Sequence, residues 1–274
     1  MTERVAALAV PYAEEADAPA EARPRLLRRG IALVVVFWWV ATGLIIVMQR
    51  NEATRVAGLI VATLLALLGL HEMHASRDDV TPTGVRRSFL GGALLWGWVS
   101  ATFYGGWLTG IHPGDVVAPA PSWAAVMPAI AATLVTDAAA LILMIVAALM
   151  GRGARNRTGL WALVIFWGVQ QVAKLNVFLG VENPAANFLP PHLAYLRAFF
   201  GPPVNSPFLT ASIVALALAT VAAMWASRRG QPPGRRQAAV LHATILGLAV
   251  LEVAILGMTL ESTPWDSFLR ARGN

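Results

Sequence analysis

The chain has 274 residues, of which 57% are hydrophobic and only 13% are charged, and its mean hydropathy is +0.61. Soluble domains carry roughly 25% charged residues, so this composition argues against a soluble fold. Cysteine is absent, which excludes disulfides, thiolate metal sites and thiol nucleophiles. The net charge of +6 does not indicate nucleic-acid binding, because the arginines lie between apolar segments rather than on one face.

Seven apolar segments are long enough to cross a lipid bilayer as helices. A hydrocarbon core about 30 Å thick requires roughly 20 helical residues. The sequence therefore predicts an all-α fold, a polytopic transmembrane bundle of about seven helices within residues 30–262. The expected spans are 30–48, 55–73, 88–110, 124–150, 159–180, 208–226 and 240–260.

Three segments are expected to lie outside the spans. Residues 1–29 are rich in Ala, Pro, Glu and Arg and lack the apolar core of a secretory signal, which predicts a flexible N-terminal tail. Residues 182–207 form the largest loop, in which a proline turn precedes a short amphipathic helix that we expect on the membrane interface. Residues 263–274 are expected to be a C-terminal tail.

The basic residues predict the orientation of the bundle. Counted outside the spans, fifteen arginines lie on the side of the N-terminus and five on the opposite side. Because loops rich in Lys and Arg stay in the cytoplasm, we expect a bacterial inner-membrane protein with a cytoplasmic N-terminus and a periplasmic C-terminus. The 182–207 loop and the 263–274 tail would then be periplasmic, and Trp265 would lie at the periplasmic boundary.

Ionisable side chains occur deep within three of the expected spans. An ionisable group in hydrocarbon costs at least about 2.5 kcal/mol, so each needs a partner or a function. Counting the helical rise from the cytoplasmic ends places Lys174, the only lysine, at nearly the same depth as Asp137 and Glu252. Amide side chains close to Lys174 in sequence extend this set. We predict a buried polar cluster of Asp137, Gln170, Gln171, Lys174, Asn176 and Glu252.

Two interpretations of this cluster remain open. It could bind a ligand, hold the polar group of a pigment or move a proton. Alternatively, it could be a structural ion pair that sets the register of the helices, because ion pairs in proteins also serve structure alone.

Histidines provide a second set of candidates. His242 follows Ala238 by four residues, a spacing that would let a flat chlorin approach the helix and bind the imidazole, so His242 is a candidate pigment ligand. The alternative is a histidine that bonds neighbours or water at a helix end. His71 and His74 flank Glu72 as H-E-x-H rather than H-E-x-x-H, and we predict no metal site.

Helix 88–110 combines small and very large residues, as in Gly91-Gly92-Ala93 and Trp96-Gly97-Trp98. Small residues allow close helix packing in lipid, whereas the rings could line a groove for a pigment. In the 182–207 loop, we predict a docking surface for protein partners formed by Phe188, Pro190, Pro191, His192 and Tyr195.

Three runs of sequence carry a resemblance to a known family. They are Asn156-Arg157-Thr158-Gly159-Leu160-Trp161, Ala173-Lys174-Leu175-Asn176-Val177-Phe178-Leu179-Gly180-Val181 and Phe188-Leu189-Pro190-Pro191-His192-Leu193-Ala194-Tyr195-Leu196. In these runs the chain resembles the PuhE-type photosynthetic complex assembly proteins, found in phototrophic bacteria beside the gene for the H polypeptide of the reaction centre. It departs from the family pattern at Val99-Ser100, Thr136-Asp137 and Val253, where the family has histidines, which indicates a divergent member.

The resemblance implies a non-enzymatic factor for assembly or stability of the photosynthetic reaction centre and its light-harvesting complex. The implied partners are the subunits of those complexes, besides the lipid bilayer, and the candidate cofactor is bacteriochlorophyll. The alternative is an intramembrane enzyme or binding protein that acts on a pigment or lipid precursor at the buried Lys/Asp/Glu site.

Overall fold

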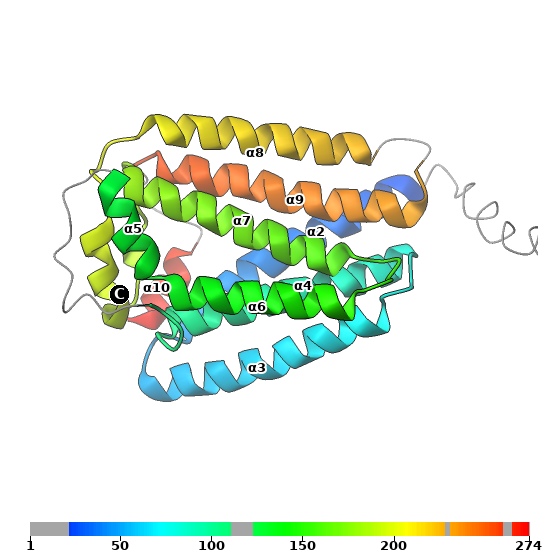
Figure 1. The fold of residues 1–274 in the computed structure, drawn as a ribbon, viewed down its shortest axis with the longest axis horizontal. Coiled ribbons are helices and arrows are strands. Elements are labelled where there is room, and N and C mark those ends of the chain that lie inside the picture. The colour runs from blue at the N-terminus through cyan, green and yellow to red at the C-terminus, as the bar shows by residue number, and fades with distance from the viewer. Residues whose placement is uncertain (1–21, 111–122, 228–230, 260–264, 274) are drawn as a thin grey trace, which may run out of the picture.

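The computed structural model describes residues 22–110, 123–227, 231–259 and 265–273, and within them the chain is all-α (Figure 1). Long helices run side by side and overlap the predicted spans, which confirms the predicted all-α fold class. They are α2 (Ala22–Val47), α3 (Glu52–Ala75), α4 (Pro82–Tyr104), α6 (Leu134–Met150), α7 (Thr158–Leu179), α8 (Pro207–Ala226) and α9 (Pro233–Leu256). Shorter elements are α5 (Trp123–Ala131), the 3-10 helices η2 (Ala186–Phe188) and η3 (Pro191–Phe199), and α10 (Asp266–Arg272).

The outer surface of the bundle is apolar. Among the described residues, five helices are long and apolar enough to cross a membrane: α2 from Leu27, α3, α7, α8 and α9. On the outermost helices, α3 and α8, aliphatic side chains such as Leu64 and Leu218 are 61% and 65% exposed. Such continuous exposure would be unfavourable in water, whereas lipid solvates it. The chain is therefore a membrane protein.

Helix α4 lies at the centre of the bundle, where it contacts α2, α3, α6, α7 and α9. Small residues permit this position, since Gly91 lies against the backbone of Gly69 in α3 and Gly92 against that of Gly159 in α7. A Cβ atom on Gly91 would lie 2.6 Å from the Gly69 carbonyl oxygen. These glycines thus serve close helix packing, one of the two alternatives that the sequence left open. Because α4 is surrounded by protein, it can be less apolar than the helices that face lipid.

One end of the bundle, which we call the arginine-rich end, carries the loops between α3 and α4 and between α6 and α7. There the Asn156 side-chain amide donates to the carbonyl oxygens of Ser76 at 3.1 Å and Asp79 at 2.9 Å. Its oxygen accepts from the Thr158 hydroxyl at 2.7 Å, and the Gly159 amide donates to Ser88 Oγ at 2.9 Å. The run of sequence that begins at Asn156 therefore joins two loops to the start of α7.

The predicted span 124–150 is not one helix. It is divided into α5 and α6, with Ala132 and Thr133 between them. Pro128 lies inside α5, and proline removes a backbone donor and clashes with the preceding turn. The break lies after Pro128, whose carbonyl still accepts from the Ala132 amide, so we attribute it to the packing of α5 on η3 and α7 and to the Thr136 amide, which donates to the Thr109 carbonyl oxygen at 3.1 Å. As a result, the N-terminus of α6 begins inside the bundle.

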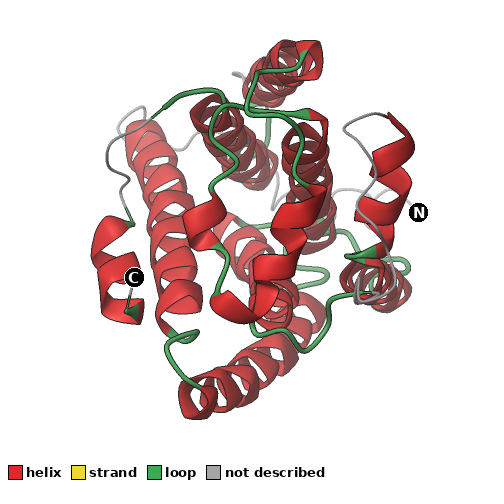
Figure 2. Cartoon of the chain, turned by 90° about the vertical axis from the view of Figure 1, so that its left-hand side faces the viewer, coloured by secondary structure: helices red, strands yellow, loops and turns green. Residues whose placement is uncertain are grey.

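The opposite end, which we call the capped end, is covered by α5, η2, η3 and α10 (Figure 2). The segment expected to be a C-terminal tail is folded from 265 to 273, because Trp265 packs on Trp38 of α2 at 4.7 Å and Phe268 on Trp39 at 5.2 Å, centroid to centroid. Trp265 is buried within the protein, and its place at the periplasmic boundary stays a prediction. The expectations for 263–264 and 274 lie outside the described residues.

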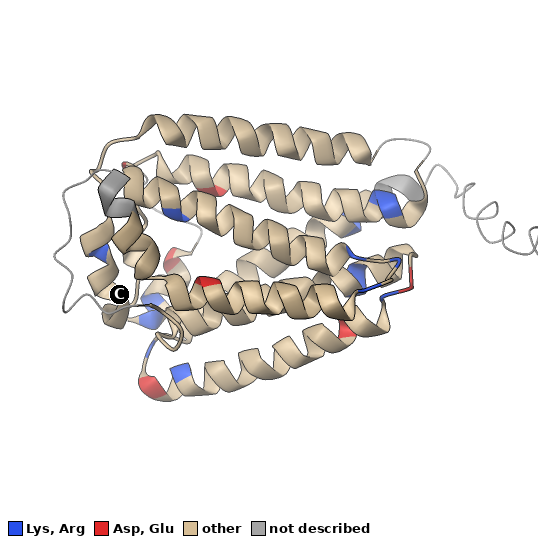
Figure 3. Cartoon of the chain, viewed as in Figure 1, with Lys and Arg blue, Asp and Glu red and all other residues tan. Residues whose placement is uncertain are grey.

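The predicted N-terminal tail is also shorter than expected. Helix α2 already includes residues 22–29, whereas the expectation for residues 1–21 lies outside the described part of the chain. Lys, Arg, Asp and Glu residues gather at the two ends of the bundle, and only a few lie along the long helices between them (Figure 3). This distribution agrees with spans that avoid charge in hydrocarbon.

The central packing yields a stability test. Gly92→Val is expected to lower the free energy of unfolding by about 1–3 kcal/mol, because any Cβ at this position would overlap the backbone of Gly159. Gly97→Val is the matched control on the same helix, since a Cβ there meets no atom within 4 Å. Thermal unfolding of both variants in detergent measures the difference. Equal losses of stability would contradict the close packing of α4 on α7.

Candidate functional site

The centre of the candidate site is an ion pair between two helices. Lys174 Nζ, on α7, lies 2.5 Å from Asp137 Oδ2 on α6, and both side chains are largely buried. The same ammonium donates to Thr133 Oγ1 at 3.0 Å, and Gln171 Nε2 donates to Asp137 Oδ1 at 2.8 Å. Three residues of the predicted cluster, Asp137, Gln171 and Lys174, are therefore in direct contact.

The helix break explains why Asp137 is accommodated here. Thr133 is the N-cap residue of α6, and Asp137 lies in the first turn of that helix. Backbone N–H groups at a helix N-terminus favour a negative charge. Sequence analysis did not single out Thr133. The sequence feature that could have indicated Thr133 is its position five residues after Pro128 and four before Asp137, because threonine is a preferred residue at a helix start.

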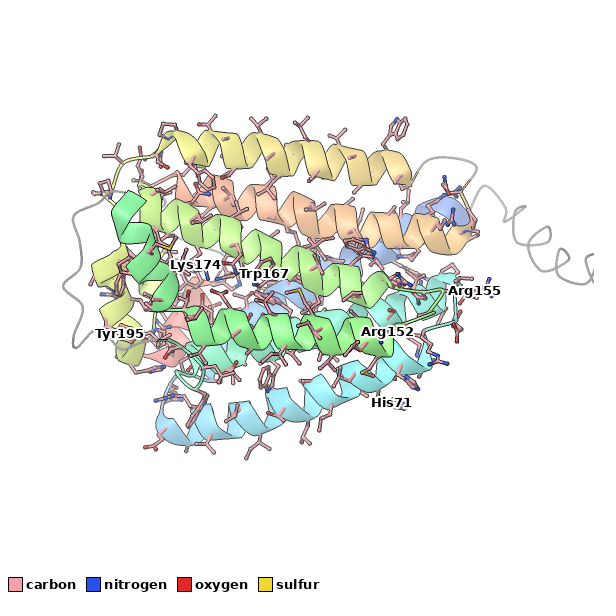
Figure 4. The ribbon with its side chains drawn as sticks, viewed as in Figure 1. His71, Arg152, Arg155, Trp167, Lys174 and Tyr195 are labelled. Carbon is pink, nitrogen blue, oxygen red and sulfur yellow. The ribbon has the colours of Figure 1, made fainter. Side chains whose placement is uncertain are left out.

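A cavity of about 320 Å³ lies beside the ion pair, with walls from α2, α4, α7 and α9 and from residues 184–200. Lys174 lines it, and Figure 4 shows this residue on the half of α7 nearer the capped end. Most of the wall is apolar, and much of it is aromatic. The aromatic residues are Phe37, Trp38, Trp96, Phe103, Tyr104, Phe166, Phe178, Phe188, Phe200 and Trp265.

Glu252, on α9, lines this cavity but does not join the ion pair. It makes no hydrogen bond or ion pair with any residue that the structure describes. Gln170 also lines the cavity, on the α7 face next to that of Gln171. Asn176 lies apart, because its amide donates to Ser212 Oγ of α8 at 3.0 Å. The predicted cluster therefore separates into three parts. Asp137 and Lys174 form the ion pair with Gln171 beside it, Gln170 and Glu252 line the cavity, and Asn176 joins α7 to α8.

Three polar residues of the cavity lie at one level. Ser100 precedes the end of α4 by four residues, Lys174 that of α7 by five, and Glu252 that of α9 by four. At 1.5 Å per residue, each lies about 6–8 Å inside the capped end. The cavity thus has a polar ring formed by these three residues, with aromatic residues on both sides of it: Phe178 and Phe188 nearer the capped end, Trp96 and Phe166 deeper. This arrangement suits an amphipathic molecule.

The residues predicted as a docking surface mostly face the protein. Phe188 lines the cavity and packs on Trp265 with ring centroids 5.8 Å apart, and Pro190 is buried. Tyr195 is half-buried beside the apolar cluster under η3, whereas Pro191 is exposed. Amphipathic η3 therefore closes the cavity end with its apolar side. A docking role for these residues stays a prediction.

His192 is half-buried, and its Nε2 lies 2.8 Å from the Tyr104 carbonyl oxygen, which joins η3 to the end of α4. Burial lowers the pKa of His192, and the nearby positive charges of Arg55 and Arg272 lower it further, while the hydrogen bond to Tyr104 opposes them. Burial likewise lowers the pKa of Arg272. Arg272 donates to the carbonyl oxygens of Phe188 at 2.8 Å and Asn187 at 2.6 Å, so α10 holds η2 in place.

His242 lies far from this cavity, near the arginine-rich end of α9. Its Nε2 is 3.2 Å from the Thr158 carbonyl oxygen, so this nitrogen carries a proton in the arrangement observed. The ring also borders a shallow hollow between α8 and α9 that includes Trp225 and Arg235. Binding of a pigment metal through Nε2 would require loss of the contact with Thr158. The pigment-ligand role of His242 stays a prediction.

Glu72 of the H-E-x-H run pairs with Arg87 of α4, with 2.6 Å between Oε2 and Nε. Across the described ranges, no group of three His, Cys, Asp or Glu side chains is placed to hold a metal ion.

The ion pair yields a test that separates structure from function. Lys174→Met alone is expected to cost about 3–5 kcal/mol of stability, because it leaves Asp137 as an unpaired buried charge. Lys174→Met combined with Asp137→Leu should recover most of this loss, which thermal unfolding would measure. If the double variant folds but has lost activity in cells, the pair is functional. A double variant no more stable than the single one would show that the pair is not the source of the cost.

Comparison with known proteins places the chain in a family. The sequence pattern of DUF3623, described as a protein of unknown function, matches residues 27–272. A protein of Rhodobacter capsulatus named "Uncharacterized 30.4 kDa protein in puhA 5'region" is 27% identical over 228 residues, which cover 81% of this chain and 83% of that protein. No solved structure matches the chain. Because the family match extends over nearly the whole sequence, the chain belongs to the DUF3623 family.

Proposed function

We propose that the chain is a non-enzymatic factor for assembly or stability of the photosynthetic reaction centre and light-harvesting complex in a bacterial inner membrane. The observation that carries the proposal is the relative from Rhodobacter capsulatus, whose name places its gene 5' of puhA. The PuhE-type proteins, which the three sequence runs resemble, are likewise found beside the gene for the H polypeptide of the reaction centre. Gene position and sequence resemblance thus support the same role.

The form of the molecule supports contact with other membrane proteins. Helices α3 and α8 lie on opposite sides of the bundle and expose aliphatic side chains to the membrane (Figure 1). On α3 these include Ile60, Val61 and Leu67, and on α8 Val221 and Met224, each more than half exposed. Helices of partner proteins can pack against such faces without removing charge from water.

The alternative, a membrane protein that binds or converts a pigment or lipid precursor, is favoured by one observation. This is the cavity with Lys174 and Glu252 in its wall.

A deletion strain tests the assembly role. In a phototrophic host that carries this gene, its removal should lower the amount of reaction centre several-fold while transcripts for the subunits remain unchanged. Absorption spectra of membranes measure the complexes, and affinity-tagged protein should co-purify reaction-centre or light-harvesting subunits from solubilised membranes. A normal level of reaction centre in the deletion strain would refute the assembly role. Accumulation of a defined pigment or lipid intermediate would favour the alternative.

We also propose that the arginine-rich end faces the cytoplasm and the capped end the periplasm, since arginine-rich loops stay in the cytoplasm. The absence of native cysteine makes a direct test possible. Gln231→Cys and Ala194→Cys introduce single thiols at exposed positions of the arginine-rich and capped ends, respectively. In intact spheroplasts, a membrane-impermeant maleimide should label Ala194→Cys and not Gln231→Cys. The reverse pattern would invert the proposed orientation.

A further inference from the structure

Several polar groups of the cavity have unused hydrogen-bonding capacity. The Ser100 hydroxyl, the Gln170 amide and the Glu252 carboxyl line the cavity and make no hydrogen bond within the described part of the chain. Lys174 has three N–H donors, of which Asp137 and Thr133 take two. Polar groups without partners are costly at membrane depth, so these groups together indicate a bound polar moiety.

Two further atoms in the cavity wall, in a residue that follows α2 and one that precedes α10, have the same property. Gln49 and Trp265 line the cavity and are only 5% and 7% exposed. Gln49 Oε1, an acceptor, and Trp265 Nε1, a donor, have no partner among the described residues. A molecule that satisfies both must donate and accept hydrogen bonds.

The size and walls of the cavity restrict the ligand further. A cavity of about 320 Å³ lies at the lower end of the range of roughly 300–1,000 Å³ found for small-molecule sites, which suits a small ligand. Trp96 and Phe166 both line it, and their ring planes are parallel within 1° with centroids 6.2 Å apart. Aromatic side chains in the wall favour a flat ring as their contact.

We infer that this cavity binds the ring of a lipid-soluble quinone or quinol. The ring oxygens accept hydrogen bonds from Ser100, Gln170, Lys174 and Trp265 and, when it is protonated, from the Glu252 carboxyl, and only the hydroxyl groups of the quinol also donate to Gln49 Oε1. The aromatic residues of the wall contact the faces of the ring. This inference does not rest on the assembly role, because binding is measured on the isolated protein.

Gly97 provides a direct way to fill the cavity. It lines the cavity on α4, and a Cβ there meets nothing within 4 Å. Gly97→Phe would place a ring in the cavity without displacing backbone. Gly168→Phe is the matched control, since Gly168 of α7 also has no neighbour within 4 Å of a Cβ but does not line the cavity.

The experiment titrates purified full-length protein in detergent with decylubiquinone and follows quenching of tryptophan fluorescence, to which Trp96 and Trp265 in the wall contribute. Wild type and Gly168→Phe should show the same saturable quenching, and Gly97→Phe should lose affinity by more than tenfold. Glu252→Leu should bind about tenfold more weakly, whereas Glu252→Gln, which keeps hydrogen bonding, should stay within about threefold of wild type.

Three outcomes would overturn the inference. The first is equal quenching of wild type and Gly97→Phe, which would place the quinone outside the cavity. The second is displacement of the quinone by decyl alcohol at similar concentrations, which would show that an acyl chain rather than a ring is recognised. The third is unchanged affinity in Glu252→Leu. If size-exclusion chromatography shows that Gly97→Phe is misfolded, the Glu252 variants decide alone.

Discussion

The ion pair between Lys174 and Asp137 depends on a helix that stops and restarts inside the membrane domain. The break between α5 and α6 brings the N-cap Thr133 and the first turn of α6 to the level of Lys174 on α7. The Asp137 carboxylate accepts from Thr133 Oγ1 at 3.3 Å and from Gln171 Nε2 at 2.8 Å as well as from the Lys174 ammonium. Its place in the first turn of a helix also favours a negative charge.

Lipid as a solvent explains the contrast between the inside and the outside of the bundle. Apolar side chains gain little by leaving lipid, so helices associate through close packing and through polar contacts. Glycines 69, 91, 92 and 159 supply the close packing around α4. Asn156 and the Lys174 pair supply the polar contacts. The lipid-facing sides of the outer helices α3 and α8 have no such features and expose aliphatic side chains.

The capped end is built from segments far apart in the sequence. Residues 186–199 cover the cavity, and α10 packs on α2 while Arg272 bonds the carbonyl oxygens of η2. His192 joins the same cover to the end of α4. Because each segment bonds another rather than the bilayer, the cover can shield the polar ring of Ser100, Lys174 and Glu252 from water. A sheltered cavity with polar and apolar walls is compatible with the assembly role and with the alternative of binding a pigment or lipid precursor, since both require a membrane protein that contacts a nonpolar molecule.

The sequence by itself determined the all-α membrane fold. It follows from a local quantity, because the length of an apolar segment is read from one stretch of chain. The small residues of α4 and the position of Lys174 inside an apolar segment could be recognised in the sequence for the same reason.

The tertiary structure alone decided which of the polar groups meet. Lys174 and Asp137 form a pair, whereas Glu252 faces a cavity and Asn176 a different helix, because the rotation of each helix about its axis depends on all of its neighbours. The break after Pro128 and the folding of the C-terminal segment were likewise missed. In both cases the outcome depends on contacts with distant elements, η3 for α5 and α2 for α10, which no local pattern specifies.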